Sequence, residues 1–169
     1  MAEMLKIDHI CKTFNAGTIN EKVALNGVDL TLEDGDFVTV IGGNGAGKST
    51  TLNAVAGVWP VDSGKIFIGG DDVTKLSEYK RAKYLGRVFQ DPMTGTAATM
   101  GIEENLALAK RRGKTRLLRP GITKAERAEY KELLKILNLG LEDRLTSKGG
   151  LLSGGQRQAL TLLMATLQK

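Results

Sequence analysis

The sequence is poor in several residue types, and each shortage excludes something. The only cysteine is Cys11, so an internal disulfide is excluded and a reducing compartment fits. Proline occurs 3 times against 21 glycines, which indicates tight turns and close backbone approaches. No stretch has 18 consecutive apolar residues, and residues 1–10 lack the basic start and apolar run of a signal peptide. The sequence therefore predicts neither a membrane span nor a leader.

Acidic residues are missing from one region, because residues 144–169 contain no Asp or Glu. The whole chain has a formal net charge of +5, which suits an anionic partner. Apolar residues make up 41% of the 169 residues, enough for a core, so the chain is not disordered by composition. The length predicts one domain, or one domain with a subdomain.

The hydrophobic pattern changes along the chain. The first half predicts a helix from Ser77 to Tyr84 and strands within residues 5–10, 23–33, 37–41, 63–72 and 86–89. In the second half, Thr123 and Glu126 form a capping-box pattern for a helix that Gly140 is expected to stop. Another apolar helix is expected after Ser153. These patterns predict a β-rich first half with an α/β core, followed by a mostly helical part from about residue 102.

The strongest chemical signal is GGNGAGKST at residues 42–50. It follows the apolar run at 37–41 and precedes a helical stretch, which is the context of a phosphate-binding loop. Glycines let several backbone N–H groups point inward, and a helix N-terminus adds partial positive charge. The alternative is a glycine-rich turn with a chance Lys-Ser. We expect ATP to bind Gly42, Gly43, Asn44, Gly45, Ala46, Gly47, Lys48, Ser49 and Thr50, with Lys48 on the β- and γ-phosphates and Ser49 on Mg²⁺.

A second signal, LSGGQ, lies at residues 152–156. Read alone, it is either an anion-binding helix start or an ordinary serine N-cap. Together with the upstream phosphate-binding loop, it resembles the signature motif of the ATP-binding-cassette (ABC) ATPases. Gln90 in VFQDP then resembles the family's Q-loop glutamine, which contacts Mg²⁺ and positions the attacking water. Phe14 in KTF resembles the aromatic residue that stacks on adenine.

The resemblance covers the entire chain and implies its fold. It implies an α/β fold: a P-loop NTPase (ABC ATPase) core with an antiparallel β subdomain and a helical subdomain, incomplete at the C-terminus. Residues 1–169 would then form a partial ABC ATP-binding domain. Residues 1–101 would hold the β subdomain and P-loop core, and residues 102–169 a mainly helical subdomain that ends in the signature helix.

The resemblance also implies partners. The chain looks like the separate ATPase subunit of a prokaryotic transporter of the importer type. Expected partners are a transmembrane permease, a second ABC ATPase subunit in a homodimer or heterodimer, and a solute-binding protein. The subunit would be cytoplasmic and peripheral on the inner face of the cell membrane. Two subunits would sandwich two ATP molecules, so that each signature serves ATP in trans through Ser153, Gly154, Gly155 and Gln156.

The chain departs from the family pattern after the signature. There the family places an Asp for Mg²⁺, an adjacent Glu and a switch His, whereas this sequence ends inside the signature helix. We therefore expect the chain to lack the Walker B carboxylates and to be hydrolysis-deficient as written. Two alternatives remain open: a non-catalytic nucleotide-binding module, and an ABC ATPase acting on nucleic acid or ribosomes. The second would use the eight basic residues within 110–127, but that stretch has no aromatic side chain for stacking, so no nucleic-acid partner is expected.

Overall fold

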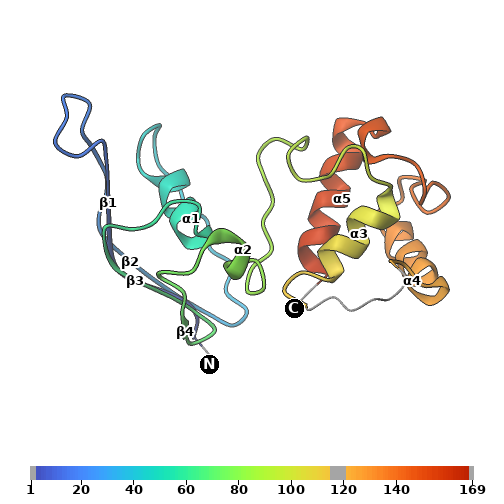
Figure 1. The fold of residues 1–169 in the computed structure, drawn as a ribbon, viewed down its shortest axis with the longest axis horizontal. Coiled ribbons are helices and arrows are strands. Elements are labelled where there is room, and N and C mark those ends of the chain that lie inside the picture. The colour runs from blue at the N-terminus through green and yellow to red at the C-terminus, as the bar shows by residue number, and fades with distance from the viewer. Residues whose placement is uncertain (1–2, 115–120, 168–169) are drawn as a thin grey trace. The chain divides into compact units, whose positions relative to one another are not determined.

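The computed structural model of the protein describes residues 3–114 and 121–167. The chain forms two compact units, Met1–Tyr84 and Leu85–Lys169, which are described separately below (Figure 1). The division lies upstream of the one between residues 101 and 102 that the sequence pattern favoured. The assignment of a β subdomain with the P-loop core and of a helical subdomain stays a prediction.

The first unit is built on an antiparallel sheet of four strands in the order β2-β1-β3-β4. The strands are β1 (Glu3–Phe14), β2 (Lys22–Glu33), β3 (Ser63–Ile68) and β4 (Asp71–Asp72). Ile66 and Ile68 are both buried, because alternate residues of a strand face the same side. In β1, Ile7 and Ile10 are buried on either side of a register shift, where His9 has a φ of 48°. The predicted strands at 5–10, 23–33 and 63–72 are confirmed, and β1 is longer than expected.

Two helices complete this unit, and Figure 1 shows both on one side of the sheet. Helix α1 (Lys48–Ala56) follows the glycine-rich loop, as predicted, and buries Ala54 and Ala56. The short α2 (Glu78–Arg81) begins after Ser77 and ends before Tyr84, so the expected helix there is only partly formed.

The strand predictions were wrong at residues 37–41 and 86–89, where the chain forms no strand. Phe37 is 92% exposed and Ile41 is 91% exposed. A β-branched, apolar run becomes a strand only when a neighbouring segment accepts its backbone hydrogen bonds. Within residues 3–114 and 121–167 no segment pairs with either run.

The second unit packs three helices around its own apolar core. They are α3 (Ile102–Lys110), α4 (Lys124–Lys135) and α5 (Gly154–Thr166), with a short 3-10 turn, η1 (Gly149–Leu151), before α5. The buried cluster draws on all three helices and on the loops between them: Ile102, Leu106, Ala107, Tyr130, Leu134, Leu141, Leu152 and Leu160. This unit therefore closes a core without residues of the first unit.

Helix α4 begins where the sequence predicted and ends earlier. The Thr123 hydroxyl accepts a hydrogen bond from the Glu126 N–H at 3.2 Å, and the Glu126 carboxylate accepts one from the Thr123 N–H at 2.8 Å. The helix stops at Lys135, and the following turn places Asn138 at a φ of 51°. Asparagine tolerates this left-handed conformation, so it reverses the chain before Gly140 is reached.

Candidate nucleotide-binding site

The glycine-rich loop owes its shape to two glycines in the left-handed region. Gly45 has a φ of 84° and Gly47 has a φ of 82°, and residues with a side chain rarely adopt this backbone conformation. Gly47 is also the N-cap residue of α1. A Cβ atom at Gly47 would lie 2.7 Å from the carbonyl oxygen of Ala24 in β2. Glycine is therefore required at residue 47 both for the turn and for the close approach to the sheet.

The Lys48 side chain closes this loop. Its ammonium donates hydrogen bonds to the carbonyl oxygens of Gly42 at 2.6 Å and of Gly43 at 2.7 Å. Residues 42–46 are exposed, and the first turn of α1 contains no acidic side chain to offset the positive end of the helix. The loop therefore places a cation beside a helix N-terminus, and both fit a phosphate group.

One residue of the loop offers an oxygen ligand for Mg²⁺. The side chain of Ser49, in the first turn of α1, is exposed. Mg²⁺ usually keeps several waters and binds one or two protein oxygens together with substrate phosphates. Among the residues that the structure describes, no group of three or more His, Cys, Asp or Glu side chains is arranged to hold a metal. Ser49 therefore fits Mg²⁺ as a single ligand beside a phosphate.

Phe14 ends β1 and is held in place from two sides. Its ring packs edge-to-face on Trp59, with the ring centroids 5.0 Å apart. The Asp62 carboxylate accepts hydrogen bonds from the Thr13 N–H at 2.6 Å and from Lys12 Nζ at 2.8 Å. The Lys12 ammonium lowers the pKa of Asp62 below its ordinary value, and the Thr13 N–H adds to this. The Phe14 ring is half-buried, and its contact with adenine stays a prediction.

The signature residues form the exposed start of α5. The Ser153 hydroxyl accepts a hydrogen bond from the Gln156 N–H at 3.3 Å, and Gln156 Oε1 accepts one from the Ser153 N–H at 3.1 Å. A Cβ atom at Gly154 or Gly155 would meet nothing within 4 Å. Packing inside this unit therefore does not require glycine at these two residues, and the helix start is open to a ligand or partner.

Sequence reasoning missed two buried polar residues that support the signature. The Asn105 side chain, 1% exposed, accepts a hydrogen bond from the Ala97 N–H at 2.7 Å and donates one to the Gly101 carbonyl at 2.9 Å. Arg157 donates from Nη2 to the Gly149 carbonyl at 3.0 Å. The Gly149 N–H in turn donates to the Met100 carbonyl at 2.8 Å. The only signal in the sequence was polar residues on otherwise apolar helix faces.

Gln90 is exposed in a bend of the second unit, whereas the phosphate-binding loop belongs to the first. The structure describes each unit by itself. A contact of Gln90 with Mg²⁺ or water therefore stays a prediction.

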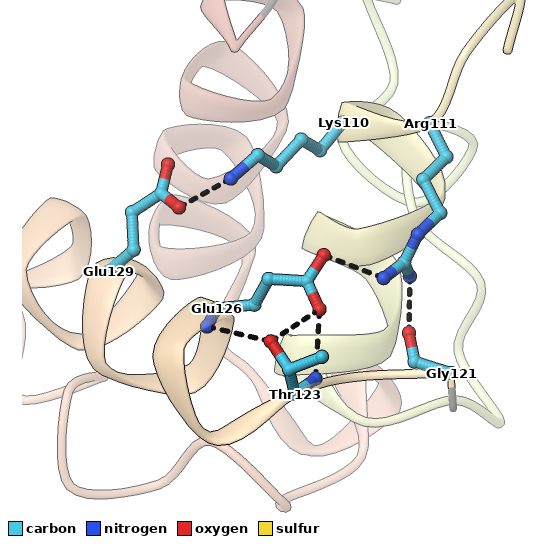
Figure 2. A network of polar contacts seen from close by, with 6 residues as sticks. All are labelled: Lys110, Arg111, Gly121, Thr123, Glu126 and Glu129. Carbon is cyan, nitrogen blue, oxygen red and sulfur yellow. Dashed lines mark hydrogen bonds and ion pairs between the residues drawn. The ribbon is translucent and has the colours of Figure 1, made fainter. Parts of the chain in front are cut away.

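Part of the basic stretch at 110–127 is used inside the second unit. Figure 2 shows the ion pairs at the end of α3 and the start of α4. In Arg127, Nε and Nη2 donate to the Glu103 carboxylate at 2.6 and 2.8 Å. The pairs are Lys110–Glu129, Arg111–Glu126 and Arg127–Glu103. These cations have intramolecular partners, which weakens the case for a nucleic-acid surface. Arg116 and Arg119 lie outside the described residues.

The glycine-rich loop with Lys48 and Ser49, followed directly by α1, is typical of nucleotide-binding proteins of the P-loop class, although residues 37–41 before it form no strand. Residues 25–169 match the family model described as ABC transporter. The chain is 40% identical over 165 residues to a tyrosine transport ATP-binding protein of Clostridioides difficile, covering 97% of this chain and 65% of that protein. It is 36% identical to the sulfate/thiosulfate import ATP-binding protein CysA of Xylella fastidiosa, covering 95% of this chain and 42% of that protein.

Solved structures agree. The dimeric ATP-binding cassette MJ0796 in a post-hydrolysis state, bound to ADP and Pi, superposes with a TM-score of 0.79 at 28% identity, covering 97% of this chain and 69% of that one. The ADP conformation of the cassette MJ1267 gives a TM-score of 0.74 at 27% identity, covering 99% and 65%. The chain belongs to the ABC transporter family and has the P-loop NTPase fold of its ATP-binding cassettes. It spans 65% of the length of the tyrosine transport protein.

Proposed function

We propose that this chain binds ATP as part of the ATPase subunit of an ABC transporter. The observation that carries the proposal is the loop at residues 42–48, in which Lys48 and the first turn of α1 converge on a space open to solvent. The Lys48 ammonium is held by two carbonyls, and a triphosphate would compete with them for it. A charge-assisted contact to phosphate is stronger than a bond to a neutral carbonyl.

Each site residue then has one role. The loop amides and Lys48 bind the phosphates, and the Ser49 hydroxyl supplies one ligand to Mg²⁺. When bound, Mg²⁺ would neutralise charge on the phosphates. Phe14 stacks on the adenine ring from the end of β1, where its own ring packs on Trp59.

A second subunit completes the arrangement. The Ser153–Gln156 start of α5 is exposed and free of close packing at its glycines, as a segment that contacts ATP bound by another subunit must be. The similar cassette MJ0796 is a dimer. By its resemblance to the family's Q-loop glutamine, Gln90 would contact Mg²⁺ and the attacking water.

The membrane partner is a permease of the importer type, with a solute-binding protein. Relatives named for tyrosine transport and for sulfate or thiosulfate import favour import. Among the described residues, no helix is long and apolar enough to cross a membrane. The subunit would then lie on the inner face of the cell membrane.

In the family, ATP hydrolysis uses an Asp, a Glu and a His that follow the signature. Residues 1–169 do not contain them at that position. Residues 157–169, after the signature, contain no Asp, Glu or His. We therefore propose that the 169-residue chain binds ATP and does not turn it over. Phosphate release near that of a family ATPase would refute this part of the proposal.

The experiment is a titration of labelled ATP with Mg²⁺ against the chain and its Lys48→Ala variant. Losing a charged hydrogen-bond partner of the phosphates costs about 1.5–3 kcal/mol, which weakens binding roughly tenfold or more. Lys124→Ala is the matched control, because it removes an exposed lysine from the other unit. Equal affinity of the chain and of Lys48→Ala would remove the phosphate-binding assignment.

A further inference from the structure

Helix α1, which carries the phosphate-binding loop, is fixed at both ends. It has only 9 residues, too few to be stable alone in water. At its N-terminus, Gly47 approaches Ala24 in β2 so closely that a Cβ atom would clash. Its last turn contains no basic residue of its own. The chain that follows the helix bonds two of its last carbonyls, because the Gly57 N–H donates to Ala54 at 3.1 Å and the Val58 N–H donates to Asn53 at 2.9 Å.

Arg81, at the end of α2, adds side-chain donors to this end of α1. Its side chain is buried, with 2% exposed. Nη1 donates to the carbonyl oxygens of Ala54 at 2.6 Å and Val55 at 2.9 Å, both in the last turns of α1. Nη2 donates to the carbonyl oxygen of Thr74 at 2.8 Å, and Nε donates to the carbonyl oxygen of Leu76 at 3.0 Å. One guanidinium thus joins the end of α1 to the segment at residues 74–76.

The surrounding chain is shaped for this guanidinium. Gly57, the C-cap of α1, has a φ of 81°, and a Cβ atom there would lie 2.8 Å from Arg81 Nε. A positive charge at a helix C-terminus interacts favourably with the helix dipole. Burial lowers the pKa of Arg81, because loss of solvation disfavours the charged form of the guanidinium. The bonds and the dipole compensate for that loss of solvation.

We propose that Arg81 is a positioning residue for ATP binding, which fixes the phosphate-binding loop by clamping the opposite end of α1. This proposal rests on the proposed function. The bonds of Arg81 go to residues 54–55 and 74–76, so it acts on the phosphates through the helix and not by contact. A rigid helix of two to three turns transmits a shift at its end to Lys48 and the loop amides at its start.

The test compares Arg81→Met and Arg81→Lys with a matched control, Glu103→Gln. Glu103 is also a buried, charged residue with hydrogen-bond partners, but its bonds go to Arg127 in the other unit. Labelled ATP with Mg²⁺ is titrated at a temperature where circular dichroism shows each variant folded. We expect Arg81→Met to raise the Kd roughly tenfold, because small displacements of positioned groups have large effects. Arg81→Lys should fall between Arg81→Met and the unaltered chain, since an ammonium cannot reach all four carbonyls. Glu103→Gln should leave the Kd unchanged.

Amide hydrogen exchange without nucleotide separates positioning from simple loss of stability. In folded Arg81→Met, exchange should quicken in residues 43–51 and stay unchanged in β1. If Arg81→Met does not fold, Arg81→Lys carries the same test. An unchanged Kd in the Arg81 variants, with Lys48→Ala still weakened, overturns the role of Arg81 alone. Absence of ATP binding by the chain itself overturns the proposed function and this inference together.

Discussion

The two units of this chain are stabilised by different kinds of contact. The second unit gathers Leu106, Tyr130, Leu134 and Leu160 into one closed apolar cluster, and side-chain caps begin α4 and α5. The first unit leaves Phe37 and Ile41 exposed, and neither of its helices has a side-chain cap bond. Its α1 is instead held by a close backbone approach and a buried arginine.

The signature and the phosphate-binding loop, one in each unit, differ in the same way. The signature start is a capped helix end on a complete core, so its geometry depends little on anything outside the second unit. The phosphate-binding loop follows an apolar segment that has no ladder partner among the described residues. Its geometry therefore depends on a few polar and steric contacts, and single changes there should be felt at the site.

The largest expected effect is in the second core. Leu134→Ala removes a fully buried side chain, which should lower the free energy of unfolding by about 2–5 kcal/mol. The only tryptophan, Trp59, belongs to the first unit, so its fluorescence reports on that unit alone. In urea, far-UV circular dichroism should show an earlier transition while the Trp59 transition stays in place. Equal shifts of both signals would mean that the units unfold together.

A smaller effect is expected at the phosphate-binding loop. Gly47→Ala forces a side chain into a left-handed backbone and against the Ala24 carbonyl, at a cost of about 1–3 kcal/mol. Here the Trp59 transition should move and the helical signal of the second unit should not. Gly43→Ala is the control, because a Cβ atom there would meet nothing within 4 Å. A similar shift in both variants would show that crowding at residue 47 is not the cause.

Local signals in the sequence predicted the parts of the fold that depend on near neighbours. The capping-box pattern at Thr123 predicted where α4 begins, and the serine N-cap at Ser153 predicted where α5 begins, because the partners of each cap lie within four residues. The glycine pattern predicted the loop before α1, because left-handed residues are a local requirement. The strand at residues 23–33 followed from its alternation of apolar and polar residues, whereas the antiparallel arrangement was implied by the family resemblance.

The features that the sequence failed to predict depend on residues that are remote in sequence. Residues 37–41 have strand composition, but a strand exists only through partners remote in sequence. The same holds for Arg81 and Asn105, whose roles depend on carbonyls and N–H groups brought together by the fold. A buried polar side chain gives no local sequence signal of which backbone groups it will bind. The contacts that position the site were therefore the part that sequence could not predict.

Capping provides a third comparison between the units. Thr123→Ala removes the bond from the Glu126 N–H and should cost about 1 kcal/mol, the usual price of losing an N-cap. Ser77 occupies the same position before α2 in the first unit but makes no side-chain cap bond. Ser77→Ala should therefore change stability by only a few tenths of a kcal/mol, typical of an exposed surface change. Thermal unfolding of the two variants measures the difference, and equal losses would contradict the contrast in capping.

The smallest effect is in the acid response of the units. Hydrogen bonding from the Thr123 N–H, with Arg111 nearby, lowers the pKa of Glu126 from 4.5, and Lys12 and the Thr13 N–H lower that of Asp62 from 3.8. A carboxylate with a lowered folded pKa stabilises the fold above its unfolded pKa, and this contribution is lost as the pH falls through the folded value. The loss should therefore begin near pH 4.5 for Glu126 in the second unit and near pH 3.8 for Asp62 in the first. Urea unfolding from pH 7 to pH 3, compared with Glu126→Gln and Asp62→Asn, isolates each contribution. For each variant, the difference in free energy of unfolding from the unaltered chain should shrink as the pH falls. A constant difference would mean that the carboxylate does not contribute in this way.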